Sequence, residues 1–140
     1  MLSASLLLTL ALADAPTPPP DSAVSDAGEL QGEWEIVRFA FGTNDLTRVY
    51  EGDRWVFAGH SARFIGASGR IGSPRALLVN VAGEPSEIDV TDQDGQTEQG
   101  IYRRASDELL WARKLAGDGR PSSFNPASGV RSATLRRVKK

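Results

Sequence analysis

Between residues 33 and 138 the chain is a succession of short segments with strand-like character, separated by residues that favour turns. Side chains alternate between the two faces of a strand, so an alternating pattern predicts one buried face. No segment has a sustained helical period, and a single turn at 26–31 is the best helix candidate. The predicted strands are 33–41, 54–58, 62–67, 76–81, 87–91, 98–104, 109–114 and 132–138.

The connections between these strands determine the expected topology. Most are of turn length, and a parallel crossover needs a dozen or more residues, so the pattern predicts an antiparallel meander. Eight meandering strands remove their exposed edges most simply by closing into a barrel. We therefore expect an all-β fold, a single antiparallel up-and-down barrel of about eight strands that is lipocalin-like. A β-sandwich is the alternative.

The first predicted strand carries apolar residues on both faces. Trp34 and Ile36 share one face, whereas Val37, Phe39 and Phe41 share the other. This change of phase predicts a β-bulge near positions 36–37 that turns the second set inward.

The N-terminal part of the chain does not resemble the rest. Residues 1–15 combine an apolar run with two Ala-x-Ala cleavage patterns, which is typical of a signal peptide although the segment has no basic residue. Residues 16–27 are rich in Pro and Ala and resemble an extended linker. We expect residues 28–140 to form the domain, the mature protein to be exported, and no segment to span a membrane permanently.

Composition excludes several classes of function. The formal net charge is −2, which argues against a nucleic-acid-binding protein that depends on bulk positive charge. The chain has no Cys, so disulfides, thiolate zinc sites and Cys nucleophiles are excluded.

Six local patterns occur in an order that is more specific than any one of them. They are Leu30-Gln31-Gly32-Glu33-Trp34, Pro85-Ser86-Glu87-Ile88-Asp89, Gly100-Ile101-Tyr102, Asp107-Glu108-Leu109-Leu110, Arg120-Pro121-Ser122-Ser123-Phe124 and Leu135-Arg136-Arg137. In this order the chain resembles an uncharacterised family of lipocalin-like domains found in planctomycete bacteria. The resemblance implies a lipocalin-like fold and frequent export, and it carries no reaction. The chain departs from that pattern at Trp111 and at 115–119.

The Gly32-x-Trp34 pattern resembles the opening motif of lipocalins, in which a Trp plugs the closed end of the barrel. First and last strands are neighbours in a closed barrel, so Arg136 or Arg137 is expected to lie over the Trp34 ring. Such a cation–π contact is worth about 0.5–2 kcal/mol. A core Trp without an Arg partner is the simpler alternative.

No residue pattern supports catalysis, a cofactor or a metal. Asp92-x-Asp94-Gly95 lacks the remaining ligands of a calcium loop and fits a hairpin turn better. His60 is the only His and has no evident catalytic partner. The glycines at 66, 69 and 72 lack the Lys-Ser/Thr of a phosphate loop. Asp89, Asp107 and Glu108 fit solvated charges better than a catalytic carboxylate pair.

The expected function is therefore non-enzymatic binding of a small apolar ligand at the open end of the barrel. The loops 42–53, 68–75, 92–97 and 116–130 should surround that mouth, where Arg120 and Phe124 would form a lid with Phe124 folded inward. In the simpler alternative Phe124 only anchors a long loop. A solid barrel that acts as a structural or protein-interaction module is the alternative function. The sequence does not indicate an oligomeric state.

Overall fold

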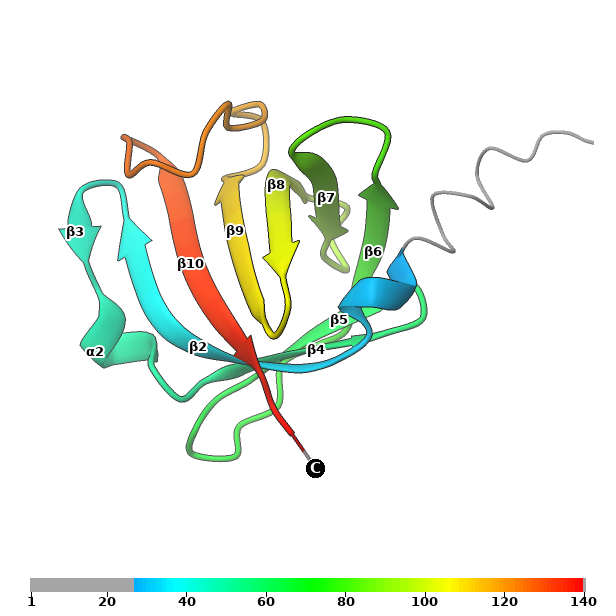
Figure 1. The fold of residues 1–140 in the computed structure, drawn as a ribbon, viewed down its shortest axis with the longest axis vertical. Coiled ribbons are helices and arrows are strands. Elements are labelled where there is room, and N and C mark those ends of the chain that lie inside the picture. The colour runs from blue at the N-terminus through cyan, green and yellow to red at the C-terminus, as the bar shows by residue number, and fades with distance from the viewer. Residues whose placement is uncertain (1–26, 140) are drawn as a thin grey trace, which may run out of the picture.

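The computed structural model describes residues 27–139, which form one β-barrel (Figure 1). Residues 1–26, which carry the predicted signal peptide and nearly all of the predicted linker, lie outside the described residues. The elements are η2 (Ala27–Leu30), β2 (Gly32–Phe41), β3 (Asn44–Asp45), α2 (Thr47–Tyr50), β4 (Arg54–Ala58), β5 (Ser61–Ile65), β6 (Arg75–Asn80), β7 (Ser86–Thr91), β8 (Thr97–Ala105), β9 (Glu108–Lys114) and β10 (Val130–Arg137).

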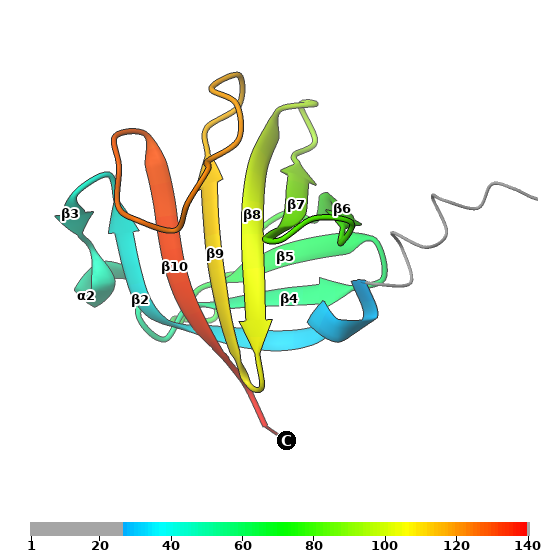
Figure 2. The same ribbon diagram turned by 45° about the horizontal axis from the view of Figure 1, so that its top comes forward.

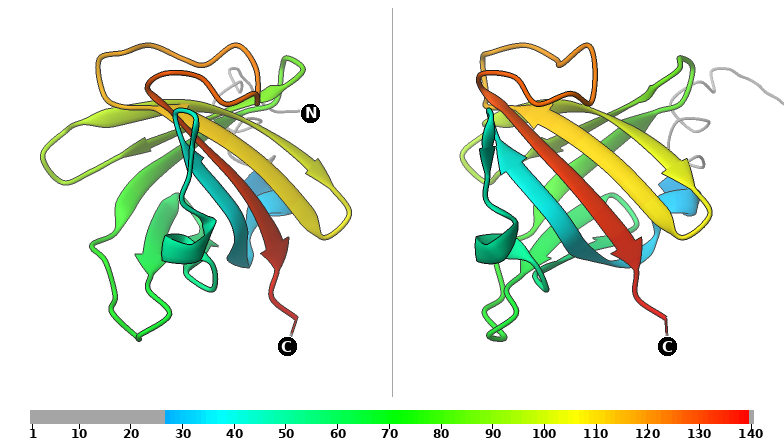
Figure 3. Two further views of the ribbon diagram at one scale, coloured as in Figure 1. Left: turned by 90° about the vertical axis from the view of Figure 1, so that its left-hand side faces the viewer. Right: turned by 60° about the vertical axis from the view of Figure 1, so that its left-hand side comes forward.

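The sheet closes on itself. From β4 to β10 each strand pairs antiparallel with the next, and β2 pairs with both β4 and β10. The short β3 pairs only with the last two residues of β2. In Figure 3, β10 lies between β2 and β9, where the barrel closes. The predicted all-β, lipocalin-like antiparallel barrel of eight strands is confirmed.

β2 joins two groups of strands that cross each other: it pairs with β10 along one edge and with β4 along the other. β8, β9 and β10 run side by side, whereas β4 and β5 cross behind them (Figure 2). In the pairing of β2 with β10 the register passes from Ile36–Leu135 to Arg38–Thr134, which leaves Val37 without a partner. This irregularity is the predicted bulge, and it brings both Ile36 and Phe39 into the core.

The barrel wall is weakest between β5 and β6. Only two residue pairs, Ser61–Ala76 and Ala62–Arg75, join these strands. The end of β5 pairs instead with the loop that follows it, through a bridge between Ile65 and Ile71. A loop rather than a strand therefore completes this part of the wall.

Apolar side chains fill the barrel interior toward the end where β2 begins. The fully buried residues there include three from the first two strands of the barrel, Trp34, Ile36 and Phe57, together with Leu30 from η2. Trp111 and Tyr102 face them from β9 and β8. This packed end is called the closed end below, and the opposite end is called the open end.

A smaller apolar cluster lies on the outer face of the wall. Ile101, Ala112 and Val130 are buried there, and Phe124 packs against them. Their neighbours Tyr102 and Trp111 point into the barrel, so alternation directs Ile101 and Ala112 outward. The long 115–129 loop is thus held on the outside of β8 and β9.

Candidate functional site

The closed end is sealed by Trp34 and Arg137. The indole Nε1 of Trp34 donates a hydrogen bond of 2.8 Å to the carbonyl oxygen of Leu30. The guanidinium carbon of Arg137 lies 4.2 Å from the centre of the Trp34 ring. Arg137 also donates to the carbonyl oxygens of Gln31 at 2.7 Å and Glu29 at 2.9 Å. These contacts fasten η2 over the end of the barrel.

Of the two arginines considered from the sequence, Arg137 is therefore the one over Trp34. Arg136 lies one position earlier on β10, where its side chain is exposed on the outer face. It pairs in register with Glu108 of β9 and Glu35 of β2.

Arg120 and Phe124 also lie on the outside of the barrel. Arg120 donates to both carboxylate oxygens of Asp89, at 2.6 and 3.3 Å, and to the carbonyl oxygen of Gly100 at 2.8 Å. Phe124 packs on the outer cluster, where the guanidinium carbon of Arg103 lies 5.1 Å from its ring centre. The inward position expected of a plug is not the one that Phe124 takes, because the outer face of β8 and β9 offers it an apolar surface.

The open end contains a pocket of about 850 Å³. Aromatic side chains form much of its wall: Phe39 and Tyr50, whose ring centres are 4.5 Å apart, and Trp55 and Phe64, which meet edge to face at 5.5 Å. Three of the four loops that the sequence placed at the mouth, 42–53, 68–75 and 92–97, contribute residues to the lining of the pocket. Residues of the 115–129 loop are not among those that line it.

Three arginines from three strands line this pocket and converge on one carboxylate beside it. Glu98 of β8 accepts a hydrogen bond from Nε of Arg113 at 2.8 Å and another from Nη1 of Arg131 at 2.8 Å. Nη1 of Arg75 lies 3.8 Å from the same carboxylate. Arg75, Arg113 and Arg131 all line the pocket. We call them, together with Glu98, the interior charge cluster.

Arg113 is the most deeply placed member of the cluster, with its side chain only 8% exposed. Its guanidinium carbon lies 4.5 Å from the ring centre of Trp111 and 5.2 Å from that of Trp55. Burial lowers the pKa of Arg113 to about 10, an effect that Glu98 opposes and that the charges of Arg131 and Arg75 reinforce. The guanidinium therefore stays protonated at neutral pH.

The sequence analysis did not identify this cluster, because it did not ask which charged residues share a strand face with core residues. The alternation of side chains along each strand could have revealed it, because residues two or four positions apart share a face. Arg113 is two positions from Trp111 and Arg131 is two positions from Ala133, so each arginine shares the inward face of a core residue. In the same way Glu98 shares the face of Tyr102, four positions away.

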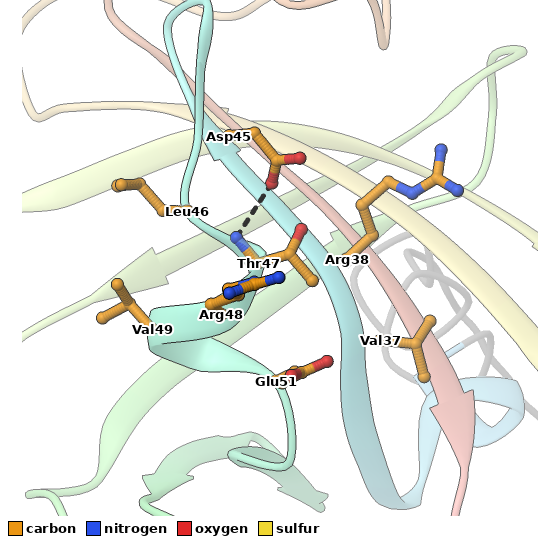
Figure 4. Close-up of a pocket in the computed structure, with 8 residues that line it drawn as sticks. All are labelled: Val37, Arg38, Asp45, Leu46, Thr47, Arg48, Val49 and Glu51. Atoms are coloured by element: carbon orange, nitrogen blue, oxygen red, sulfur yellow. Dashed lines mark hydrogen bonds between the residues drawn. The ribbon is translucent and has the colours of Figure 1, made fainter.

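A second hollow, of about 600 Å³, lies outside the barrel between β2 and the α2 segment (Figure 4). Val37 and Arg38 come from β2, whereas Arg48, Val49 and Glu51 come from α2 and the residue after it. One of its two carboxylates, that of Asp45, accepts a 2.9 Å hydrogen bond from the backbone N–H of Thr47. Hydrogen bonds from Thr47 lower the pKa of Asp45. Asp45 thus serves the local turn, and we regard the interior pocket as the candidate site.

The other residues considered from the sequence have local roles. One carboxylate oxygen of Asp92 accepts hydrogen bonds from the backbone N–H groups of Asp94 and Gln96, both at 2.9 Å, as in a tight hairpin turn. His60 is exposed in the turn between β4 and β5. Among residues 27–139, no group of three or more His, Cys, Asp or Glu side chains is arranged to hold a metal ion.

Two further findings concern the whole described region. None of the helices within it is both long enough and apolar enough to cross a membrane. Comparisons with known protein families, with curated proteins and with solved structures found no match for this chain.

Proposed function

We propose that this domain is a non-enzymatic binding protein that holds a small organic molecule in the pocket at its open end. The observation that carries the proposal is the pocket of about 850 Å³ beside Trp55 and Phe64. Ligand pockets typically measure roughly 300–1,000 Å³ and are lined largely by apolar and aromatic side chains. The aromatic wall supports the apolar ligand body that the sequence suggested.

The two ends of the barrel favour a single entry route. Trp34, Arg137 and η2 cover the closed end, and backbone hydrogen bonds close most of the wall. At the open end the wall between β5 and β6 is completed by the 66–74 loop, whose residues line the pocket. A ligand would enter beside this loop.

Binding is favoured over catalysis by the state of the acidic groups in and beside the pocket. Beside it, Glu98 is engaged by Arg113 and Arg131. In its wall, Asp53 accepts a 2.8 Å hydrogen bond from the backbone N–H of Ala67, Asp92 accepts two from backbone N–H groups of its own turn, and Asp94 is exposed at that turn. A general base needs a carboxylate within reach of the substrate proton and not neutralised by cations. We therefore propose that these groups position and hold, and do not react.

Titration with two fluorescent probes of the same shape tests the proposal. The probes are uncharged N-phenylnaphthylamine and its sulfonated counterpart, anilinonaphthalene sulfonate. We expect at least one to bind saturably at one site per chain, and Phe64→Ala to weaken that binding. Phe124→Ala is the matched control, because Phe124 lies on the outer face. If neither probe saturates, the proposal is wrong and the solid-barrel interaction module becomes the better account.

Export completes the proposal and rests only on the sequence of residues 1–15. We propose processing near Ala13 or Ala15, as in the exported lipocalin-like family that the chain resembles. N-terminal sequencing of the protein isolated from its own cells tests this. An intact Met1 on the mature protein would contradict it.

A further inference from the structure

We propose that the ligand of the open-end pocket is an organic anion, and that Arg75, Arg113 and Arg131 bind its charged group. This inference rests on the proposed function and specifies its ligand class. The chemistry required is a carboxylate, sulfonate or phosphate group on an apolar or aromatic body.

The first argument is the charge balance inside the barrel. Three guanidinium groups surround one carboxylate, that of Glu98, so the interior charge cluster has a net charge of 3 − 1 = +2. Unpaired charge is costly where it is buried, and here that cost falls mainly on Arg113, whose side chain is 8% exposed, since those of Arg75 and Arg131 are 34% and 32% exposed. Glu98 pairs with all three arginines at once and cannot neutralise them. An anion in the pocket would compensate for the excess.

The second argument is the number of donors that remain. Glu98 takes one hydrogen bond from Nε of Arg113 and one from Nη1 of Arg131. At 3.8 Å, Arg75 is too far from Glu98 to donate to it. Within the described part of the chain, the guanidinium of Arg75 and the two terminal nitrogens of Arg113 make no hydrogen bond. These N–H groups belong to residues that line the pocket, where a bound oxyanion would accept from them.

The remaining charges of the pocket wall, one arginine and three carboxylates, sum to 1 − 3 = −2, but among the described residues they form no ion pair with the cluster, so the excess at the three arginines is local. Asp53 and Asp92 lie in loops and accept hydrogen bonds from backbone N–H groups. Asp94 is exposed at the turn between β7 and β8. None of these three carboxylates forms an ion pair with an arginine of the cluster, and Arg70 adds a further positive charge to the lining.

The third argument is the position of the aromatic wall. The guanidinium carbons of Arg75 and Arg113 lie 5.8 and 5.2 Å from the ring centre of Trp55. Phe64 meets the same indole at 5.5 Å. A ligand whose anionic group reaches the arginines therefore places its apolar body against Trp55 and Phe64. This arrangement suits an amphipathic anion better than a bare inorganic ion.

The matched probes separate this inference from the proposed function. Both have the same aromatic body, and only anilinonaphthalene sulfonate carries a charge. We expect the sulfonate to bind at least about tenfold more tightly, the size of one charge-assisted hydrogen bond. Equal affinities would overturn the inference and leave the proposed function standing. Binding of neither probe would overturn the proposed function itself.

Variants on β10 test whether the arginines are responsible. We expect Arg131→Gln to weaken sulfonate binding about tenfold and to leave the affinity of the uncharged probe unchanged. Arg136→Gln removes the same charge from the outer face of the same strand and is the control for attraction to surface charge. Equal losses in the two variants would overturn the inference. Circular dichroism and the melting temperature establish that each variant is folded.

Glu98→Gln should change sulfonate affinity in the opposite direction to Arg131→Gln. Loss of this carboxylate frees two guanidinium groups and removes the anion that competes with the ligand. We expect the sulfonate to bind more tightly than to the unmodified protein, by about threefold or more. The titration is made under conditions in which circular dichroism shows the variant to be folded. If the arginines served only to pair with Glu98, the folded variant would bind the sulfonate no more tightly than the unmodified protein does, and that result would overturn the inference.

Discussion

The carboxylate of Glu98 and the guanidinium of Arg113 form a 2.8 Å ion pair inside the barrel wall, with both side chains nearly buried. The pair lies at the boundary between two parts of the interior. On one side Trp34, Phe57 and Tyr102 fill the barrel, and on the other the pocket opens to solvent. The polar pair thus marks the depth at which packing ends and the candidate site begins.

Loss of the Glu98 charge should destabilise the fold. In Glu98→Gln, Arg113 keeps its charge but loses its buried counter-ion, and we expect the free energy of unfolding to fall by about 3 kcal/mol. Urea denaturation measures this change. Glu84→Gln is the control, because the ion pair of Glu84 with Arg103 is exposed and should contribute less than about 1 kcal/mol. Equal effects of the two substitutions would contradict a buried role for Glu98.

The closed end should depend strongly on Trp34. Truncation in Trp34→Ala removes a fully buried indole and should cost about 3–5 kcal/mol of unfolding free energy. Arg137→Gln should cost about 1 kcal/mol, because it removes the cation over the ring. Arg136→Gln on the outer face should have almost no effect. A loss below about 1 kcal/mol for Trp34→Ala would show that Trp34 does not plug the barrel.

Phe124→Ala should separate anchoring of the long loop from gating of the pocket. Because Phe124 packs on Ile101, Ala112 and Val130 outside the barrel, its truncation should lower the melting temperature and leave probe affinity unchanged. Fluorescence titration and thermal denaturation of the same sample measure both. Increased probe uptake with unaltered stability would instead support a lid.

Gly100 is a point of close approach between β8 and β9. A Cβ atom there would lie 2.7 Å from the carbonyl oxygen of Ala112 and 3.0 Å from Nε1 of Trp111. Gly100→Ala should therefore cost about 1–3 kcal/mol through overpacking. Gly28→Ala is the control, since no atom lies within 4 Å of the added Cβ. A neutral Gly100→Ala in urea denaturation would mean that the two strands can separate without cost.

The fold was accessible from the sequence because its determinants are local. Alternation within strands and short turns between them predicted the closed meander, and the phase change between Ile36 and Phe39 predicted the bulge. The contact between Trp34 and one of two arginines followed from closure, since first and last strands must be neighbours. The choice of Arg137 needed the register, which depends on the bulge.

The candidate site was less accessible because it depends on contacts between distant segments. The alternation of side chains along β9 and β10 could have predicted that Arg113 and Arg131 face inward, but only the closed barrel shows that they meet at Glu98. The 115–129 loop has no periodic pattern, so nothing in its sequence distinguished an inward Phe124 from one on the outer wall. The apolar ligand expected at first lacked the charged group that the interior cluster now suggests.

The three indoles provide the most direct test of binding inside the barrel. Trp55 lines the pocket, and the ring centre of Trp111 lies 5.0 Å from that of Trp55. Trp34 is hydrogen-bonded at the closed end. In two-dimensional ¹H–¹⁵N NMR during titration with anilinonaphthalene sulfonate, we expect the indole N–H signal of Trp55 to shift most. The Trp111 signal should shift less, and that of Trp34 should not move. Trp55→Phe assigns the signal. Saturable binding that leaves Trp55 unshifted, or that shifts Trp34 instead, would contradict a ligand site at the open end of this barrel.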